Sequence, residues 1–267
     1  MAKSLEQVVA EGLIADCGSQ EELFVLWQTV HHMETDTLGE TCCKEIDPRS
    51  FHIDGVINPQ KFSGVLYLLK EPNLKAYIEK GLTFPVITDI RREFRQYKKG
   101  FKDECGYLVG MQRILLGEAE KEMSSQQVMD TLGVLYINKR GGRGEQDNLW
   151  LRYGYAYVEF IKRQIHLIQP RVIICVGEEI FHFVLDELFS RKKTLRSRVE
   201  QWIWKGMNDE YLFTADSSYR YTPRPDRAAV IAVNMWNPTE VRNGGEVPSP
   251  EAYLSEFERR VYGVEPA

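Results

Sequence analysis

LLKEPN, residues Leu68 to Asn73, is the first of three similar stretches that decide the fold we expect; the others are LYINKR (Leu135 to Arg140) and VNMWNPT (Val233 to Thr239). Each begins in a short aliphatic and β-branched run, the pattern of a strand buried on both faces in a parallel sheet. Each then turns polar, so its polar residues would follow the carboxyl end of a strand, where open α/β sheets bind ligands. The three stretches therefore predict one shared site.

Proline follows two of these polar ends directly, in Glu71-Pro72 and Asn237-Pro238. Proline keeps the preceding residue extended and fixes its own φ, so both side chains would be held at a stiff corner. With Asn138 after the second run, one carboxylate and two carboxamides are expected at the same edge of the sheet.

Four apolar runs are predicted as strands: Gly64 to Leu69, Val134 to Ile137, Arg171 to Val176 and Ala229 to Met235. Helical patterns separate them, which predicts an α/β fold, a three-layer α/β/α sandwich with a central four-stranded parallel sheet. Residues 1–60 are predicted as an N-terminal helical lead packed on the core, and residues 61–267 as the main domain. Residues 201–214 fit either an edge strand or an extra helix.

Composition narrows the class of protein. The net charge of −5 argues against a protein that coats nucleic acid indiscriminately, although it leaves room for a local basic face. No apolar run is long enough to span a bilayer and the start has no signal-peptide core, so we expect a cytoplasmic protein, and a monomer. The five cysteines are odd in number and lack CxxC spacing, so we expect no disulfide framework, metal, iron–sulfur cluster or other cofactor.

The motifs exclude several kinds of chemistry. Glu71 is the only carboxylate that follows a predicted strand directly, so a two-carboxylate glycosidase pair is not evident. Gly-x-Ser-x-Gly, a Cys/His nucleophile and a phosphate-binding GxxxxGK[ST] are also missing. What remains is one carboxylate able to orient or deprotonate water, and two amides able to hold a polar heterocycle. This set suits hydrolysis of a bond whose leaving group needs hydrogen bonds more than a full proton.

The glycine-rich segment KRGGRG, Lys139 to Gly144, directly follows Asn138 and carries the cations Lys139, Arg140 and Arg143. Its glycines would let the backbone approach a ligand closely, so the segment is a candidate phosphate-binding loop. A loop whose cations only face solvent is the alternative.

In order and placement these motifs resemble those of the uracil-DNA glycosylase superfamily over roughly residues 60–245. LKEPN is similar to the family's first motif, Gly-Gln-Asp-Pro-Tyr or Gly-Ile-Asn-Pro-Gly, with Glu71 in the place of the water-activating acid and Leu69 in place of its glycine. LYIN puts Asn138 in the place of the base-reading asparagine. NPT is similar to the last motif, His-Pro-Ser or Asn-Pro-Ser, with Asn237 in the place of the histidine. The glutamate is one methylene longer than the family's aspartate.

The resemblance implies a monofunctional DNA glycosylase that acts on a flipped-out base. Glu71 and Asn237 would be catalytic, and Asn138 would bind the base. Val241 would be the apolar wedge that fills the vacated stack. Phosphate contacts are expected from Arg242, Lys139, Arg140 and Arg143.

Asn73 stands where the uracil-specific branch has a tyrosine that excludes thymine, so it would be a base-binding residue in a pocket with a lowered wall. A C5-modified pyrimidine, such as a glycosylated base of phage DNA, would then be the substrate, in an antiviral role; uracil repair is the alternative.

Each residue also has a purely structural interpretation: Glu71 as a cap before a helical proline, Asn138 and Asn237 as turn residues, and Asn73 as a solvent-facing helix start. Two other functions stay open, a non-catalytic DNA- or partner-binding module and a small-molecule nucleoside hydrolase.

Overall fold

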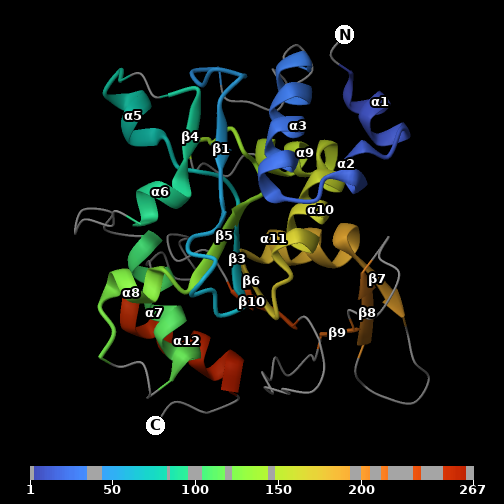
Figure 1. The fold of residues 1–267 in the computed structure, drawn as a ribbon. Coiled ribbons are helices and arrows are strands. Elements are labelled where there is room, and N and C mark those ends of the chain that lie inside the picture. Colours follow the sequence, from blue (N-terminus) through green and yellow to red (C-terminus); the bar gives the residue numbers. More distant parts are fainter. Residues whose placement is uncertain are drawn as a thin grey trace. The chain divides into compact units, whose positions relative to one another are not determined.

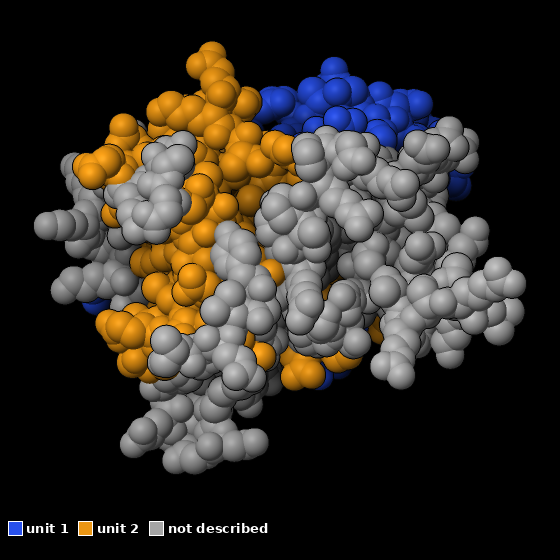
Figure 2. All heavy atoms as spheres, turned by 90° about the horizontal axis from the view of Figure 1, so that it is seen from below, with its two compact units in different colours: residues 1–55, 69–91, 135–169 blue, residues 56–68, 92–134, 170–267 orange. Residues whose placement is uncertain are grey.

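The computed structural model describes residues 3–34, 44–82, 85–95, 104–117, 122–143, 148–192, 200–204, 212–215, 231–235 and 249–262. The described residues form a mixture of helices and strands (Figure 1), which is compatible with the predicted α/β class. The chain divides into two compact units that are each assembled from separated segments (Figure 2). Unit 1 comprises residues 1–55, 69–91 and 135–169, and unit 2 comprises residues 56–68, 92–134 and 170–267. The segment predicted as an N-terminal lead thus contributes its first 55 residues to unit 1.

A five-stranded sheet contains all four predicted strands, in the order β10-β6-β3-β5-β2. Its strands are β2 (Gly55–Val56), β3 (Val65–Leu69), β5 (Leu132–Tyr136), β6 (Val172–Val176) and β10 (Ile231–Met235). Strand β6 runs parallel to both β10 and β3. Strands β3, β5 and β6 are buried along their whole length, which is why they appear in the sequence as uninterrupted apolar runs. The fifth strand, β2, was not predicted, because two residues are too few to form such a run.

The strand order changes direction at β3. The next predicted strand in the chain, β5, lies on one side of β3, whereas the following strand, β6, lies on the other side, with β10 beyond it. In doubly wound sheets, ligands bind outside the carboxyl ends of the strands where the order reverses. Glu71 comes two residues after the end of β3.

Unit 1 is built around Trp27, which is fully buried. Its indole stacks on the ring of Phe160 at 4.9 Å and meets the edge of Phe51 at 5.7 Å. The unit contains α1 (Leu5–Ala10), α2 (Leu13–Asp16), α3 (Gln20–Met33), α5 (Lys75–Glu79), α9 (Leu149–Ala156), α10 (Val158–Ile168) and the parallel pair β1 (Phe51–Ile53) and β4 (Ile87–Asp89). Helix α10 ends at Ile168 and is capped by Gln169, whose φ of 50° is left-handed; Pro170 follows.

Unit 2 contains α7 (Glu104–Leu116), α8 (Ser125–Met129), α11 (Glu178–Phe183), a π-helical segment (Val184–Leu188) and α12 (Pro250–Tyr262); α6 (Ile90–Arg95) ends in it. Residues 201–214, left open by the sequence, include β8 (Glu200–Trp204) and most of β9 (Leu212–Ala215), which form an antiparallel sheet with β7 (Phe189–Lys192). In the core, the buried amide of Gln112 accepts a hydrogen bond from the Tyr67 hydroxyl and donates to Thr131. Every helix among the described residues is too short or too polar to cross a membrane.

Candidate functional site

Glu71 and Asn138 lie side by side after the ends of two neighbouring strands. Backbone hydrogen bonds extend the pairing of β3 and β5 past the strand ends, from Ile137 N to the Leu69 carbonyl and from Asn138 N to the Lys70 carbonyl, both 2.9 Å. The Asn138 side chain then donates from Nδ2 to Glu71 Oε2 at 2.8 Å. Glu71 is 9% exposed and Asn138 is 1% exposed, so a carboxylate and a carboxamide meet at the edge of the protein interior.

Gly141 and Gly142 bring the backbone against this carboxylate. Gly142 N donates to the Pro72 carbonyl at 3.0 Å, and Leu74 N donates to the Gly142 carbonyl at 2.8 Å, so the two loops pair like short strands. A Cβ added at Gly142 would lie no more than 2.5 Å from any of the three carboxylate atoms of Glu71. Gly141 has a φ of +83°, in the left-handed region that favours glycine. Gly141 and Gly142, two of the three glycines in the predicted ligand-binding loop, therefore allow the loop to pack against Glu71.

The Asn138 amide is held in one orientation. Its Oδ1 accepts from Arg140 N at 3.0 Å, while its Nδ2 donates to Glu71 and, more weakly, to the Gly141 carbonyl at 3.5 Å. Both ends of the amide are thus engaged within the protein. To donate a hydrogen bond from Nδ2 to a base, Asn138 has to give up its hydrogen bond to Glu71.

Lys139 does not lie on a surface loop, contrary to both interpretations of the sequence. Its side chain is fully buried, and Nζ lies 2.7 and 2.6 Å from the two carboxylate oxygens of Asp54. The same carboxylate accepts hydrogen bonds from Tyr136 N and from Gln164 Nε2, both at 2.7 Å. Burial lowers the pKa of the Lys139 ammonium, and the Asp54 charge opposes that shift. The predicted phosphate contact of Lys139 is therefore replaced by an internal ion pair.

His52 fixes the same loop from the backbone side. Its backbone N donates to the Lys139 carbonyl at 2.7 Å, and its Nδ1 donates to that carbonyl at 2.9 Å. Burial lowers the pKa of His52, so the ring is held in the neutral form with its proton on Nδ1. The loop after Asn138 is thus held by buried contacts to Lys139. Asp54 pairs with its ammonium, Gln164 donates to Asp54, and His52 donates to its carbonyl.

Arg140 is also buried, which corrects the prediction that it faces a phosphate or solvent. Its guanidinium carbon lies 5.0 Å from the centre of the Tyr153 ring. Arg143 is the most accessible of the three predicted cations, with a side chain 34% exposed, and it forms an ion pair with Glu45 at 2.5 Å. Of the loop cations, Arg143 alone retains the surface position that a phosphate contact requires.

Asn73 has an exposed side chain, and its Oδ1 accepts a hydrogen bond from Lys75 N at 3.0 Å at the start of α5. This is the arrangement of the solvent-facing helix start rather than that of a pocket wall. Asn237, Val241 and Arg242 lie outside the described residues, which resume only at residue 249 after β10 ends at Met235.

Sequence reasoning missed the supporting residues because none of them is next to a predicted strand end. Asp54 directly precedes Gly55, and this pair of residues by itself indicates only a turn. A signal was present in the sequence: Lys139 comes two residues after the buried-strand pattern at 134–137, and a charge that enters the interior beside an apolar run requires a partner.

The described residues hold no group of three or more His, Cys, Asp or Glu side chains that could bind a metal ion. The site itself offers a nearly buried carboxylate with an oriented amide beside it. Such a carboxylate can accept a proton from water or offset a developing positive charge. Comparison of the chain with models of protein families, with curated proteins and with solved structures found no match.

Proposed function

We propose that the protein is a monofunctional DNA glycosylase that hydrolyses the N-glycosidic bond of a flipped-out pyrimidine. The hydrogen bond of 2.8 Å between Asn138 and Glu71 carries this proposal, because it unites the first two motifs of the resemblance at one place. The proposal includes membership of the uracil-DNA glycosylase superfamily and its three-layer sandwich, with β10, β6, β3 and β5 of the five-stranded sheet as the family's four parallel strands. It also includes a monomeric, cytoplasmic protein whose partner is DNA.

In the proposed reaction, the target nucleotide rotates out of the duplex at a cost of roughly a few kcal/mol. Glu71 orients a water molecule against C1′ and accepts one of its protons. The water oxygen forms a bond to C1′ while the C1′–N1 bond breaks, and the base leaves with the bonding electrons. The products are a free base and an abasic site. The carboxylate also offsets the positive charge that develops on the sugar.

Asn138 exchanges its hydrogen bond to Glu71 for the Watson–Crick edge of the base. This exchange would remove the Asn138 hydrogen bond from the carboxylate only when a base has arrived. Asn237 would stabilise the departing base, Val241 would fill the vacated stack, and Arg242 and Arg143 would contact flanking phosphates.

The proposed substrate is a pyrimidine with a C5 substituent, in an antiviral role against phages with modified DNA. The choice rests on the resemblance, in which position 73 carries asparagine where the uracil-specific branch has the tyrosine that excludes thymine. If the protein excises plain uracil and no C5-substituted base, the antiviral role is refuted and uracil repair is the function.

A small-molecule nucleoside hydrolase is the second candidate. The burial of Lys139 and Arg140 favours it, because two of the three loop cations expected to contact DNA are used inside the protein. A hydrolase of this kind needs the carboxylate and the amide but no phosphate contacts.

The test uses oligonucleotides that carry uracil, a thymine mismatch, 5-hydroxymethylcytosine or glucosylated 5-hydroxymethylcytosine, in single- and double-stranded form. Alkali-labile abasic sites are scored for the unaltered protein, for Glu71→Gln and for the matched control Glu79→Gln, an exposed carboxylate on α5. Cleavage lost only in Glu71→Gln establishes the glycosylase. Release of a free base from nucleosides alone indicates the small-molecule hydrolase, and DNA binding without any cleavage indicates a non-catalytic module.

A further inference from the structure

A second candidate site lies within unit 2. It is an open groove of about 550 Å³ lined by Asn58, Pro59, Gln60, Arg95, Gln126 and Asp130. Residues 58–60 come before β3, and residues 126–130 come before β5, so the groove is built at the amino ends of these neighbouring strands. Glu71 and Asn138 follow their carboxyl ends, and the two sites share no residue.

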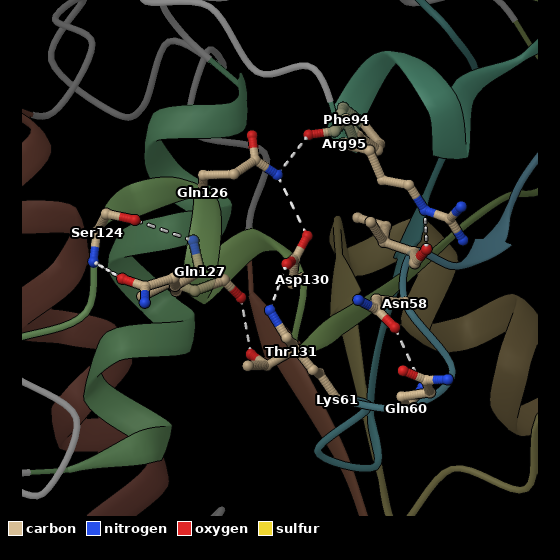
Figure 3. Close-up of polar contacts among 12 residues, drawn as sticks. Asn58, Gln60, Lys61, Phe94, Arg95, Ser124, Gln126, Gln127, Asp130 and Thr131 are labelled. Carbon is tan, nitrogen blue, oxygen red and sulfur yellow. Dashed lines mark hydrogen bonds and ion pairs between the residues drawn. The ribbon is translucent and has the colours of Figure 1, made fainter.

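Arg95 is fixed at one end and open at the other. Its Nε donates to the Ile57 carbonyl at 2.6 Å, which sets the plane of the guanidinium (Figure 3). Within the described part of the chain, its two Nη nitrogens make no hydrogen bond. A guanidinium held in this way presents a rigid pair of donors that matches the oxygens of a phosphate.

Amide side chains make up much of the remaining lining (Figure 3). Asn58 Oδ1 accepts from Gln60 N at 3.2 Å, which leaves the Asn58 NH₂ group for a ligand. Gln126 Nε2 donates to the Phe94 carbonyl at 3.1 Å and to Asp130 at 3.3 Å, which leaves its Oε1 as an acceptor. Amides that offer a donor and an acceptor are the groups that proteins use to hydrogen-bond the edge of a nucleobase.

The charge in the groove favours an anion. Asp130, its one carboxylate, is already paired with Lys61 Nζ at 2.9 Å and accepts from Gln126, so it repels a phosphate less than a bare carboxylate would. Arg95 adds a positive charge without a carboxylate partner among the described residues. The exposed ring of Pro59 supplies an apolar surface on which a base can lie.

We propose that this groove binds one nucleotide unit, with its phosphate on Arg95 and its base on the amides of Asn58, Gln60 and Gln126. The volume suits a ligand of this size, since small-molecule sites usually measure about 300–1,000 Å³. The nucleotide can be free or part of an unpaired strand, because both offer the same phosphate and base edge. The site does not depend on the proposed glycosylase activity.

Binding of the four 5′-deoxymononucleotides, of inorganic phosphate and of an unmodified single-stranded oligonucleotide is measured by calorimetry. Arg95→Gln is expected to raise the Kd of a mononucleotide at least tenfold, and Arg92→Gln, on the same helix but outside the groove lining, is expected to leave it unchanged. Gln60→Glu, at an exposed position, keeps Arg95 but replaces an amide on the base side with a carboxylate and adds a negative charge to the groove, so it should weaken binding without unfolding the protein. If the oligonucleotide binds tightly and the mononucleotides bind weakly, and if Arg95→Gln and Gln60→Glu both abolish the tight binding, the natural ligand is an unpaired strand.

The proposal is overturned if neither Arg95→Gln nor Gln60→Glu changes the affinity for any of these ligands. Binding lost in Glu71→Gln and kept in Arg95→Gln would also overturn it, because the nucleotide would then occupy the other site. Nucleotide binding that depends on Arg95, in a protein that excises no base, would leave this inference standing while the glycosylase proposal failed.

Discussion

Gly142→Ala tests whether the glycine loop holds the Glu71 carboxylate in place. The added methyl carbon would stand no more than 2.5 Å from any of the three carboxylate atoms, whereas real Cβ contacts are never this close. The nearest atom must retreat by more than about 1 Å to reach an ordinary van der Waals distance. Because Gly142 is tied by backbone hydrogen bonds on both sides, the side chain of Glu71 has to move rather than the loop.

A movement of this size disrupts the site. The bond of 2.8 Å from Asn138 would lengthen to roughly 3.8 Å, beyond the range of a hydrogen bond. Displacement of a catalytic group by about 1 Å costs on the order of 100-fold in rate. Overpacking should lower the free energy of unfolding by about 1–3 kcal/mol, so the protein should still fold.

The assay is the single-turnover excision rate on the best substrate of the oligonucleotide panel, together with urea unfolding. The Asn138 side-chain amide signals in NMR report the same displacement without any substrate. Gly106→Ala is the matched control, because Gly106 lies inside α7 with no atom within 4 Å of the added carbon. It should keep full activity and gain about 0.5–1 kcal/mol of stability. A Gly142→Ala protein with unchanged amide signals and an excision rate within about twofold of the original would refute the reasoning.

Three further outcomes are expected. Asp54→Asn should lower the free energy of unfolding by about 3–5 kcal/mol, because it leaves the Lys139 ammonium buried without its counter-charge. The double variant Asp54→Asn, Lys139→Met should lower the free energy of unfolding by less than Asp54→Asn alone. Effects of the two substitutions that simply add would contradict this prediction. Burial lowers the pKa of both His31 and His52 in the folded protein. Below pH ~6.5 the unfolded chain therefore binds protons that the folded chain does not bind, and the folded state loses stability. Urea unfolding should show the free energy of unfolding falling by up to about 1.4 kcal/mol per pH unit for each histidine as the pH drops toward 5. His31→Phe should flatten this decrease, and an unchanged slope would show that His31 is not responsible. Gln112→Met should destabilise the protein by about 1–3 kcal/mol, because it leaves the buried hydroxyls of Tyr67 and Thr131 without their amide partner; a change below about 0.5 kcal/mol would contradict this assignment.

The main sheet and the meeting of Glu71 with Asn138 could be predicted from the sequence. Strands buried on both faces leave continuous apolar runs, and the first polar residues after two neighbouring strands must lie near one another. The antiparallel strands β7 to β9 could not be predicted, because such short runs fit an edge strand and a helix equally well.

The positions of Lys139 and Arg140 could not be predicted either. A charged residue enters the interior only where a partner meets it, and the partner of Lys139 is Asp54, 85 positions earlier in the chain. Local patterns contain no information on that pairing. The hydrophobic pattern correctly predicts which strands are buried. It does not predict the burial of a charged residue whose charge is neutralised by a residue distant in the sequence.

The separation of Asp54 from Lys139 has a consequence during synthesis of the chain. A ribosome adds about 5–20 residues per second, so the 85 positions between the two residues correspond to a delay of roughly 4–17 s. Throughout that interval Asp54 is present without the ammonium that balances it in the folded protein. Trp27 in turn needs Phe160, so the core of unit 1 can reach its final packing only after residue 160 has left the exit tunnel.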